Sequence, residues 1–128
     1  MIKKILFTIF ILIYYFGYSQ VAIGRSKTEI MQRYSADGIV SSVGKDGLNQ
    51  ATYQTEIMLV MYYFNEDDLC KETIICPLNS YGLKAYRDKF NKEYMEIDSN
   101  NWSFYVKGIK HFVSYEFIEP HGMFWIHL

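Results

Sequence analysis

Apolar residues are densest between Thr55 and Pro77, and their pattern predicts a β-hairpin. The stretch up to Phe64 is rich in β-branched, aromatic and long apolar residues, which strands favour. Residues 65–68, Asn-Glu-Asp-Asp, supply a polar turn, and the chain then returns as a second strand to Pro77. Because side chains alternate along a strand, the first strand has two faces. One face holds Met58, Val60, Tyr62 and Phe64, and the other holds Ile57, Leu59, Met61 and Tyr63.

Both faces of this strand are apolar, which is typical of the middle of a sheet. Either both faces are covered by other elements, or one is left for a partner. We expect the candidate binding surface to be the even-numbered face, made of Met58, Val60, Tyr62 and Phe64. An open patch there would suit a protein, whereas a closed pocket would suit a small molecule.

Two helices are predicted, one on each side of the hairpin. The first begins at Ser26, where Ser-Lys-Thr-Glu matches a capping box, and ends at Asp37-Gly38. The second follows Pro77, with Asn79 or Ser80 as its N-cap, and ends before Asp98. Its apolar residues recur at helical spacing and form one stripe: Leu83, Tyr86, Phe90, Tyr94 and Ile97.

The remaining apolar segments read as strands. A short strand is expected at Ile39–Val43, while Leu48–Thr52 is ambiguous and is interpreted as a loop. Three more strands are expected at Trp102–Lys107, Lys110–Glu119 and Met123–Leu128. The fold class is therefore α+β: an antiparallel sheet with two helices packed on one face, in the order helix, three strands, helix, three strands.

The N-terminus has the pattern of a cleavable signal peptide. Lys3 and Lys4 precede an apolar run of 12 residues, and small residues lie at −3 and −1 of a cut after Ser19. The run is shorter than the about 20 residues that span a bilayer as a helix. We therefore expect residues 1–19 to be removed and residues 20–128 to form a single exported domain, periplasmic or secreted. A retained membrane anchor is the alternative.

Composition narrows the classes of partner. The formal net charge is −1, and removal of two signal lysines makes it more negative. This balance gives no electrostatic case for binding nucleic acid or an anionic membrane. Aromatic residues make up 18% of the chain and Pro occurs only twice, so we expect a folded core rather than disorder.

No catalytic or metal-binding constellation is predicted. Cys70 and Cys76 lie too far apart along one strand to form a disulfide with each other, and they lack metal-binding spacing. His111, His121 and His127 lack the tight spacing of known metal sites. We therefore expect no enzyme activity, no cofactor and no metal. A hydrolase or metal enzyme that uses the histidines is the third-ranked hypothesis.

Two short segments resemble small exported envelope proteins of bacteria. They are residues 23–30, a Gly followed by a capped helix just after the signal, and residues 62–65, Tyr-Tyr-Phe-Asn, before an acidic turn. The chain looks similar here to the β-lactamase-inhibitor-protein-like and SmpA/OmlA outer-membrane-assembly families. The resemblance implies helices on one face of an antiparallel sheet and action by protein–protein contact without catalysis. It implies no functional residue.

The leading hypothesis is therefore an exported, non-catalytic envelope protein that binds another protein or an envelope component. The alternative is a small-molecule-binding domain with an aromatic-lined cavity.

Overall fold

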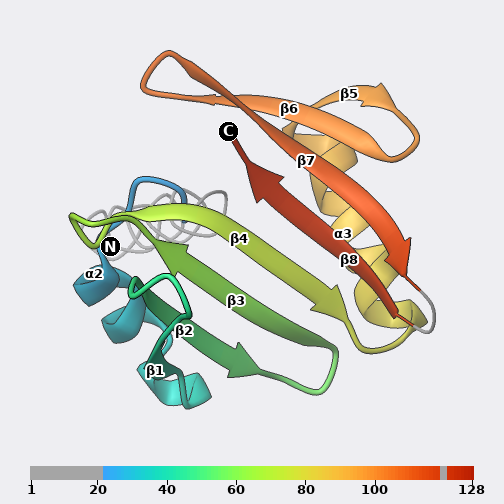
Figure 1. Ribbon diagram of the computed structural model, residues 1–128. Coiled ribbons are helices and arrows are strands. Elements are labelled where there is room, and N and C mark those ends of the chain that lie inside the picture. Colours follow the sequence, from blue (N-terminus) through green and yellow to red (C-terminus); the bar gives the residue numbers. More distant parts are fainter. Residues whose placement is uncertain (1–21, 119–120) are drawn as a thin grey trace, which may run out of the picture.

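The computed structural model describes residues 22–118 and 121–128. Within them, eight strands form one antiparallel sheet, accompanied by two α-helices and one 3-10 helix (Figure 1). The elements of the first half are α2 (Lys27–Arg33), the 3-10 helix η1 (Ser35–Asp37), β1 (Val40–Val43), β2 (Asn49–Gln54), β3 (Met58–Phe64) and β4 (Cys70–Pro77). Those of the second half are α3 (Ser80–Glu93), β5 (Met95–Asp98), β6 (Asn101–Val106), β7 (Ile109–Ile118) and β8 (His121–His127).

The α+β class is confirmed, but the expected order of elements is wrong. In the structure a helical region is followed by four strands, and this unit occurs twice. The sequence predicted three strands after each helix. The order across the sheet is β1-β2-β3-β4-β8-β7-β6-β5. Each half is a meander of four strands, and the halves meet where β4 pairs with β8. This seam contains three residue pairs, from Thr73–Ile126 to Ile75–Phe124.

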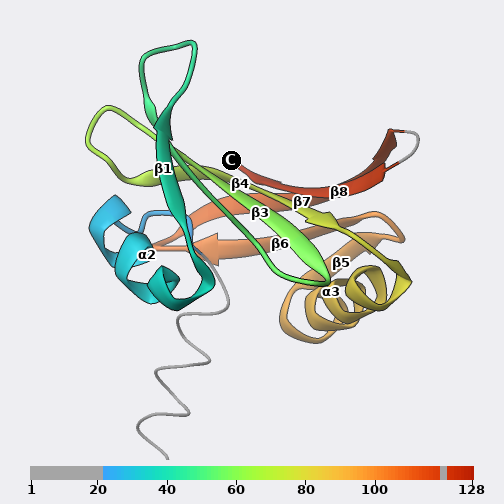
Figure 2. The ribbon, with the colours of Figure 1, turned by 90° about the horizontal axis from the view of Figure 1, so that it is seen from below.

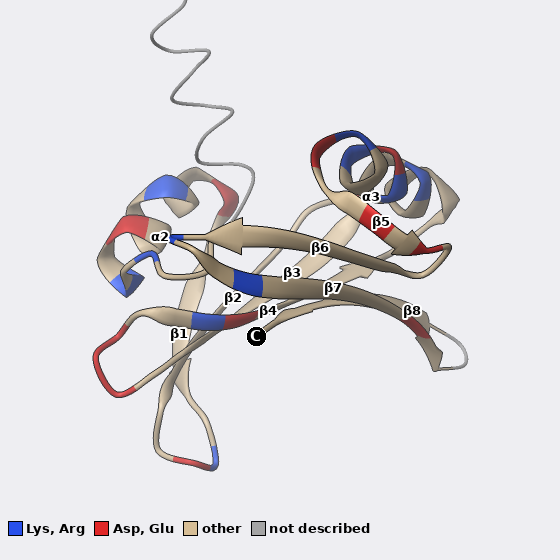
Figure 3. Ribbon diagram, turned by 90° about the horizontal axis from the view of Figure 1, so that it is seen from above, with Lys and Arg blue, Asp and Glu red and all other residues tan. Residues whose placement is uncertain are grey.

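Both α-helices lie on the same face of the sheet (Figure 2). The strand register shows which side chains face them, because residues paired across antiparallel strands point to the same side. One row runs across six strands beneath the helices, and all of its members are buried: Ala51, Tyr62, Thr73, Ile126, Val113 and Trp102. Charged residues gather mainly on the helices and turns (Figure 3). No described helix is both long and apolar enough to cross a membrane.

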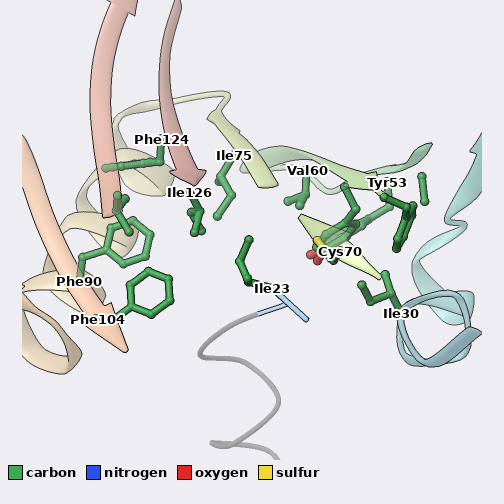
Figure 4. Close-up of a cluster of buried hydrophobic side chains, with 14 of the residues drawn as sticks. Ile23, Ile30, Tyr53, Val60, Cys70, Ile75, Phe90, Phe104, Phe124 and Ile126 are labelled. Atoms are coloured by element: carbon green, nitrogen blue, oxygen red, sulfur yellow. The ribbon is translucent and has the colours of Figure 1, made fainter. Parts of the chain in front are cut away.

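The core joins the two halves beneath the helices. In the second half, Phe90 of α3 lies against Trp102 and Phe124, with ring centroids 5.6 and 5.1 Å away. Figure 4 shows Ile23, from the segment before α2, between the Phe90–Phe104 group and the group around Cys70 and Ile30. Phe90, the central residue of the predicted stripe, is only 2% exposed, while Leu83, Tyr86 and Tyr94 are half-buried.

Two strands were not expected from the sequence. Residues 49–54, interpreted as a loop, form β2, because Ala51 and Tyr53 supply a buried face that the polar residues between them obscure. Residues 95–98 form β5 rather than the end of the second helix. That helix ends at Glu93, because Tyr94 is extended and the next residues pair with β6. Ile97, assigned to the helical stripe, is an exposed strand residue.

The hairpin and both helix starts agree with the sequence. Strands β3 and β4 pair antiparallel, and the Asn65 side chain closes their turn by accepting from the amides of Asp67 and Leu69. Ser26 is the N-cap of α2, and its Oγ accepts from the Glu29 amide at 3.2 Å. Asn79, one of two candidates, is the N-cap of α3.

Candidate functional site

The candidate surface predicted from the sequence lies on the helix-covered face of the sheet. Val60, Tyr62 and Phe64 are 1%, 3% and 0% exposed, so in this chain their side chains belong to the core. Met58 is half-buried, and its Sδ accepts a hydrogen bond from the Tyr86 hydroxyl of α3 at 2.7 Å. The four residues therefore form no open patch, and a binding role for them stays a prediction.

Three of these residues line a cavity of about 280 Å³ between the two helical regions. Its most distinctive feature is a group of tyrosines. The Tyr34 ring, at the end of α2, stacks on Tyr53 with centroids 4.5 Å apart and lies 5.8 Å from the Tyr62 ring. The lining includes Arg33, Tyr34, Asp37, Tyr53, Met58, Val60, Tyr62, Thr73, Tyr86 and Lys89.

Burial keeps the hydroxyls of this cavity protonated. Loss of solvation raises the pKa of both Tyr53 and Tyr62 well above the ordinary value, and neighbouring tyrosines add to the effect. Burial also raises the pKa of Tyr86 to about 12. At neutral pH the cavity therefore offers neutral hydroxyls and aromatic faces, which suit a flat molecule, and its lining also includes the charged residues Arg33, Asp37 and Lys89.

The opposite side of the sheet, which we call the outer face, carries a second apolar surface. It consists of Leu59, Met61, Tyr63, Ile74, Cys76, Phe112, Met123, Trp125 and His127, all half-buried. The register places Met61, Ile74 and Trp125 side by side on three neighbouring strands. Trp125 and His127 also stack, with ring centroids 4.1 Å apart. The surface is therefore continuous across the seam between the halves.

No described helix covers the outer face. Figure 1 looks onto it, with α3 behind β7 and β8, and Figure 2 shows both helices on the other side. Charged side chains that share this face by register are few: Glu72 opposite Tyr63, Asp98 opposite Asn101, Lys110 opposite Tyr105, and Glu116 opposite Met123. The Lys110 ammonium lies 5.6 Å from the centre of the Phe112 ring. An apolar centre is thus edged by a few charges.

Sequence reasoning recognised both apolar faces of β3 but selected the one that the helices cover. The missing signal was in β2. Its buried positions are Ala51 and Tyr53, whereas Gln50, Thr52 and Gln54 alternate with them. Because Tyr53 pairs with Val60, the polar face of β2 continues into the odd-numbered face of β3. Recognition of β2 as a strand would therefore have identified the outer face.

The histidines and cysteines are separated in the structure. His111 is buried against Phe104, His121 is exposed at the start of β8, and His127 lies on the outer face. Both cysteines are free, with Cys70 buried and Cys76 half-buried. Burial raises the pKa of the Cys70 thiol to about 11, which makes it a poor nucleophile at neutral pH. Among described residues, no group of three or more His, Cys, Asp or Glu could hold a metal ion.

Comparison with protein-family models, with curated proteins and with solved structures found no match. The resemblance to exported envelope families and the role of the chain therefore stay predictions.

Proposed function

We propose that this chain is an exported, non-catalytic protein that binds another protein through the outer face of its sheet. The observation that carries the proposal is the one-sided cover of the sheet. Both α-helices pack on one face, and the other face carries a continuous apolar and aromatic surface. Contiguous apolar surface on a soluble domain marks an interaction site more often than chance exposure does.

The composition of the outer face favours a protein as the partner. Trp, Tyr, Phe and Met are enriched at the centres of protein interfaces, where charged residues are depleted. Trp125 lies at the centre of this surface, between Ile74 of β4 and Ser114 of β7. Large aromatic residues in such central positions carry most of the binding energy. Glu72, Lys110 and Glu116 would form part of a polar rim.

Substitutions on the outer face test this proposal. Trp125→Ala removes the central side chain of the surface, and Met61→Lys places a charge beside it. The control is Tyr81→Ser, which changes an exposed aromatic residue of α3 on the other side of the molecule. Thermal melts first establish that all three variants fold. The tagged proteins are then crosslinked in envelope extracts, and the captured protein is identified and quantified by mass spectrometry.

We expect the original chain and Tyr81→Ser to capture one and the same protein. Both outer-face variants should fail to capture it. Equal capture by all four proteins would contradict the proposal. Sedimentation analysis adds a second check, because self-association that Met61→Lys abolishes would make the outer face an interface between copies of this chain.

Export is supported by the pattern of residues 1–19, which lie outside the described residues. We expect the mature protein to begin at Gln20. N-terminal mass spectrometry of the exported protein tests this, and an intact Met1 would overturn both the cleavage and the proposed compartment.

The tyrosine cavity supports a second candidate function, the binding of a flat small molecule. Its volume of about 280 Å³ is near the lower end of ligand sites. Tyr34 closes it from the α2 side and stacks on Tyr53. Thermal-shift screening identifies candidate ligands. Tyr34→Ala should weaken the binding of such a ligand, whereas Trp125→Ala should leave its affinity unchanged. A ligand that responds in the opposite way would contradict this assignment.

A further inference from the structure

A larger cleft, of about 660 Å³, lies where both halves of the molecule contribute turns. One wall comes from the segment before α2 and from the β3–β4 turn, and the other from the β6–β7 turn and the start of β7. Figure 3 shows that the β6–β7 turn and α2 lie toward the same end of the sheet. The lining residues include Ile23, Arg25, Glu29, Asn65, Leu69, Cys70, Lys71, Val106, Lys107, Ile109 and His111. The cleft is separate from both the outer face and the tyrosine cavity.

The walls of this cleft are held by backbone hydrogen bonds. The segment before α2 runs beside β4, with the Gly24 amide donating to the Cys70 carbonyl and the Cys70 amide donating to the Arg25 carbonyl, both at 2.8 Å. The β6–β7 turn consists of Lys107 and Gly108, both with positive φ. Positive φ at both residues lets the chain reverse direction within two residues, which places Lys107 at the tip of the hairpin.

The charges at the cleft are mainly positive. Arg25 and Glu29 form an ion pair at 3.5 Å. Glu29 is the single acidic side chain of the lining, to which Leu128, the last residue of the given chain, also belongs. Lys71 and Lys107 are both exposed, and neither takes part in an ion pair with another described residue. Two cations at the mouth of the cleft are therefore available to an anion.

His111 provides a buried polar group in the same cleft. It is 7% exposed, stacks on Phe104 with centroids 5.5 Å apart, and its Nδ1 has no hydrogen-bond partner within the described chain. A buried polar atom without a partner lowers stability. Burial lowers the pKa of this imidazole, while a hydrogen bond with the His127 backbone opposes that shift. In the tautomer that protonates Nδ1, this atom can donate one further hydrogen bond.

The rest of the lining is largely apolar. Ile23 and Cys70 are buried, while Leu69 and Ile109 expose substantial apolar surface for their type. The volume falls within the usual range of small-molecule sites. A fully hydrophilic anion would leave this surface uncovered, and a neutral apolar molecule would leave the lysines and His111 unused. The cleft is complementary to a molecule with both parts.

We propose that this cleft binds an amphiphilic carboxylate of fatty-acid type. Its carboxylate lies at Lys71 and Lys107 with His111 as a further donor, and its chain covers Ile23, Leu69 and Ile109. The proposal is independent of protein binding on the outer face.

Calorimetry measures the binding of dodecanoate, kept below its micellar concentration, to the purified full chain. The cation dodecyltrimethylammonium has the same chain length and serves as the charge control. The test variant is Lys71→Ala/Lys107→Ala, and the matched control is Lys84→Ala/Lys92→Ala, which removes two exposed lysines of α3. All four positions are exposed, so both variants should fold.

We expect saturable dodecanoate binding that is about tenfold weaker in the test variant, because charge-assisted contacts are lost, and unchanged in the control variant. The His111 ring resonances should shift in NMR spectra as dodecanoate is added. Absence of saturable binding, equal binding of the cationic amphiphile, or equal affinity in both lysine variants would each overturn the proposal. Loss of binding in Trp125→Ala would place the ligand on the outer face instead and would also overturn it.

Discussion

The two halves of the sheet share one order of elements but differ in how their helices are attached. Helix α2 has 7 residues and is followed by the short helix η1, whereas α3 has 14 residues. The backbone around α2 is hydrogen-bonded to the β3–β4 turn of its own half, through the Lys27 amide and the Asp68 carbonyl. A short helix held in this way depends on its neighbours, since helices of this length are not stable alone.

Helix α3, by contrast, contacts both halves. At its start Gly82 lies against the Ile57 carbonyl of the first half, and Tyr86 donates to Met58 of β3. Later, Arg87 donates to the Ser99 carbonyl at 2.7 Å in the second half. The seam that α3 crosses contains only three residue pairs between β4 and β8. We infer that α3 helps the β4–β8 seam to fix one half against the other.

The cores beneath the two helices also differ in chemistry. Tyr34, Tyr53 and Tyr62 stack beside α2 with interplanar angles of 14–24°. Phe90 of α3 instead packs edge-on against the Phe124 ring, at an interplanar angle of 72°. The first arrangement groups three tyrosine rings, whereas the second is centred on a phenylalanine that lines the same cavity. The two cores thus differ in ring geometry and in how many hydroxyls they hold, although Tyr86 and Tyr94 also lie against Phe90.

The strongest test of this difference is Phe90→Ala. The substitution should remove the centre of the α3 contact and destabilise the protein by about 3–5 kcal/mol, through lost transfer energy and the cavity left behind. Lys92→Ala, on an exposed position of the same helix, should change the free energy of unfolding by less than about 0.5 kcal/mol. Chemical denaturation measures both values. Equal, small losses would mean that α3 does not hold the halves together.

Alkaline pH should act on both halves, because burial raises the pKa of Tyr53 and Tyr62 in the first half and of Tyr86 and Tyr94 in the second. The pKa values of Tyr53 and Tyr62 are raised by burial, so above about pH 10 the folded state holds protons that the unfolded state has lost. Stability is therefore fully present below about pH 10 and falls as pH rises, by up to about 1.4 kcal/mol per pH unit for each group.

Tyrosine variants separate the two halves in this experiment. Tyr53→Phe/Tyr62→Phe should flatten the alkaline loss of stability more than Tyr94→Phe, because the double variant removes two tyrosines whose pKa is raised by burial and Tyr94→Phe removes one. Denaturant titrations between pH 8 and pH 11 provide the slopes. A larger effect of Tyr94→Phe would contradict this expectation.

Much of this arrangement could be predicted from local pattern, and the failures have physical causes. The β3–β4 hairpin, both N-caps and the Phe90 stripe follow from turn residues, capping side chains and helical spacing. Strand β5 was missed because Ile97 continues the helical spacing, although Tyr94 is already extended. The side of the sheet that the helices cover depends on strand register, which residues 58–64 alone could not reveal.

A glycine substitution tests the contact of α3 with the first half. In an ordinary helix Gly82→Ala would gain up to about 1 kcal/mol from helix propensity. Here a Cβ at this position would overlap the Ile57 carbonyl. Because that atom belongs to the backbone, we expect a net loss of about 1–3 kcal/mol, as for overpacked sites. Gly108→Ala, at a turn with open space but positive φ, tests backbone strain alone. A stabilising Gly82→Ala would show that this contact is loose.

The smallest expected difference concerns the two helix caps. Ser26 Oγ accepts from the Glu29 amide at 3.2 Å, and Asn79 Oδ1 accepts from the Gly82 amide at 2.9 Å. Loss of either cap should lower the free energy of unfolding by about 1 kcal/mol. Asn79 also donates to the Glu56 carbonyl of the first half at 3.4 Å.

Asn79→Ala should therefore lower stability by a few tenths of a kcal/mol more than Ser26→Ala, since it loses a contact between the halves as well as a cap. Asn79→Ser separates these two contributions, because a serine can cap the helix but is too short to reach Glu56 as the amide does. Denaturant unfolding should rank Asn79→Ser above Asn79→Ala in stability. If Ser26→Ala instead lowered the free energy of unfolding more than the other two variants, the cap of α2 would contribute more to stability than the cap of α3.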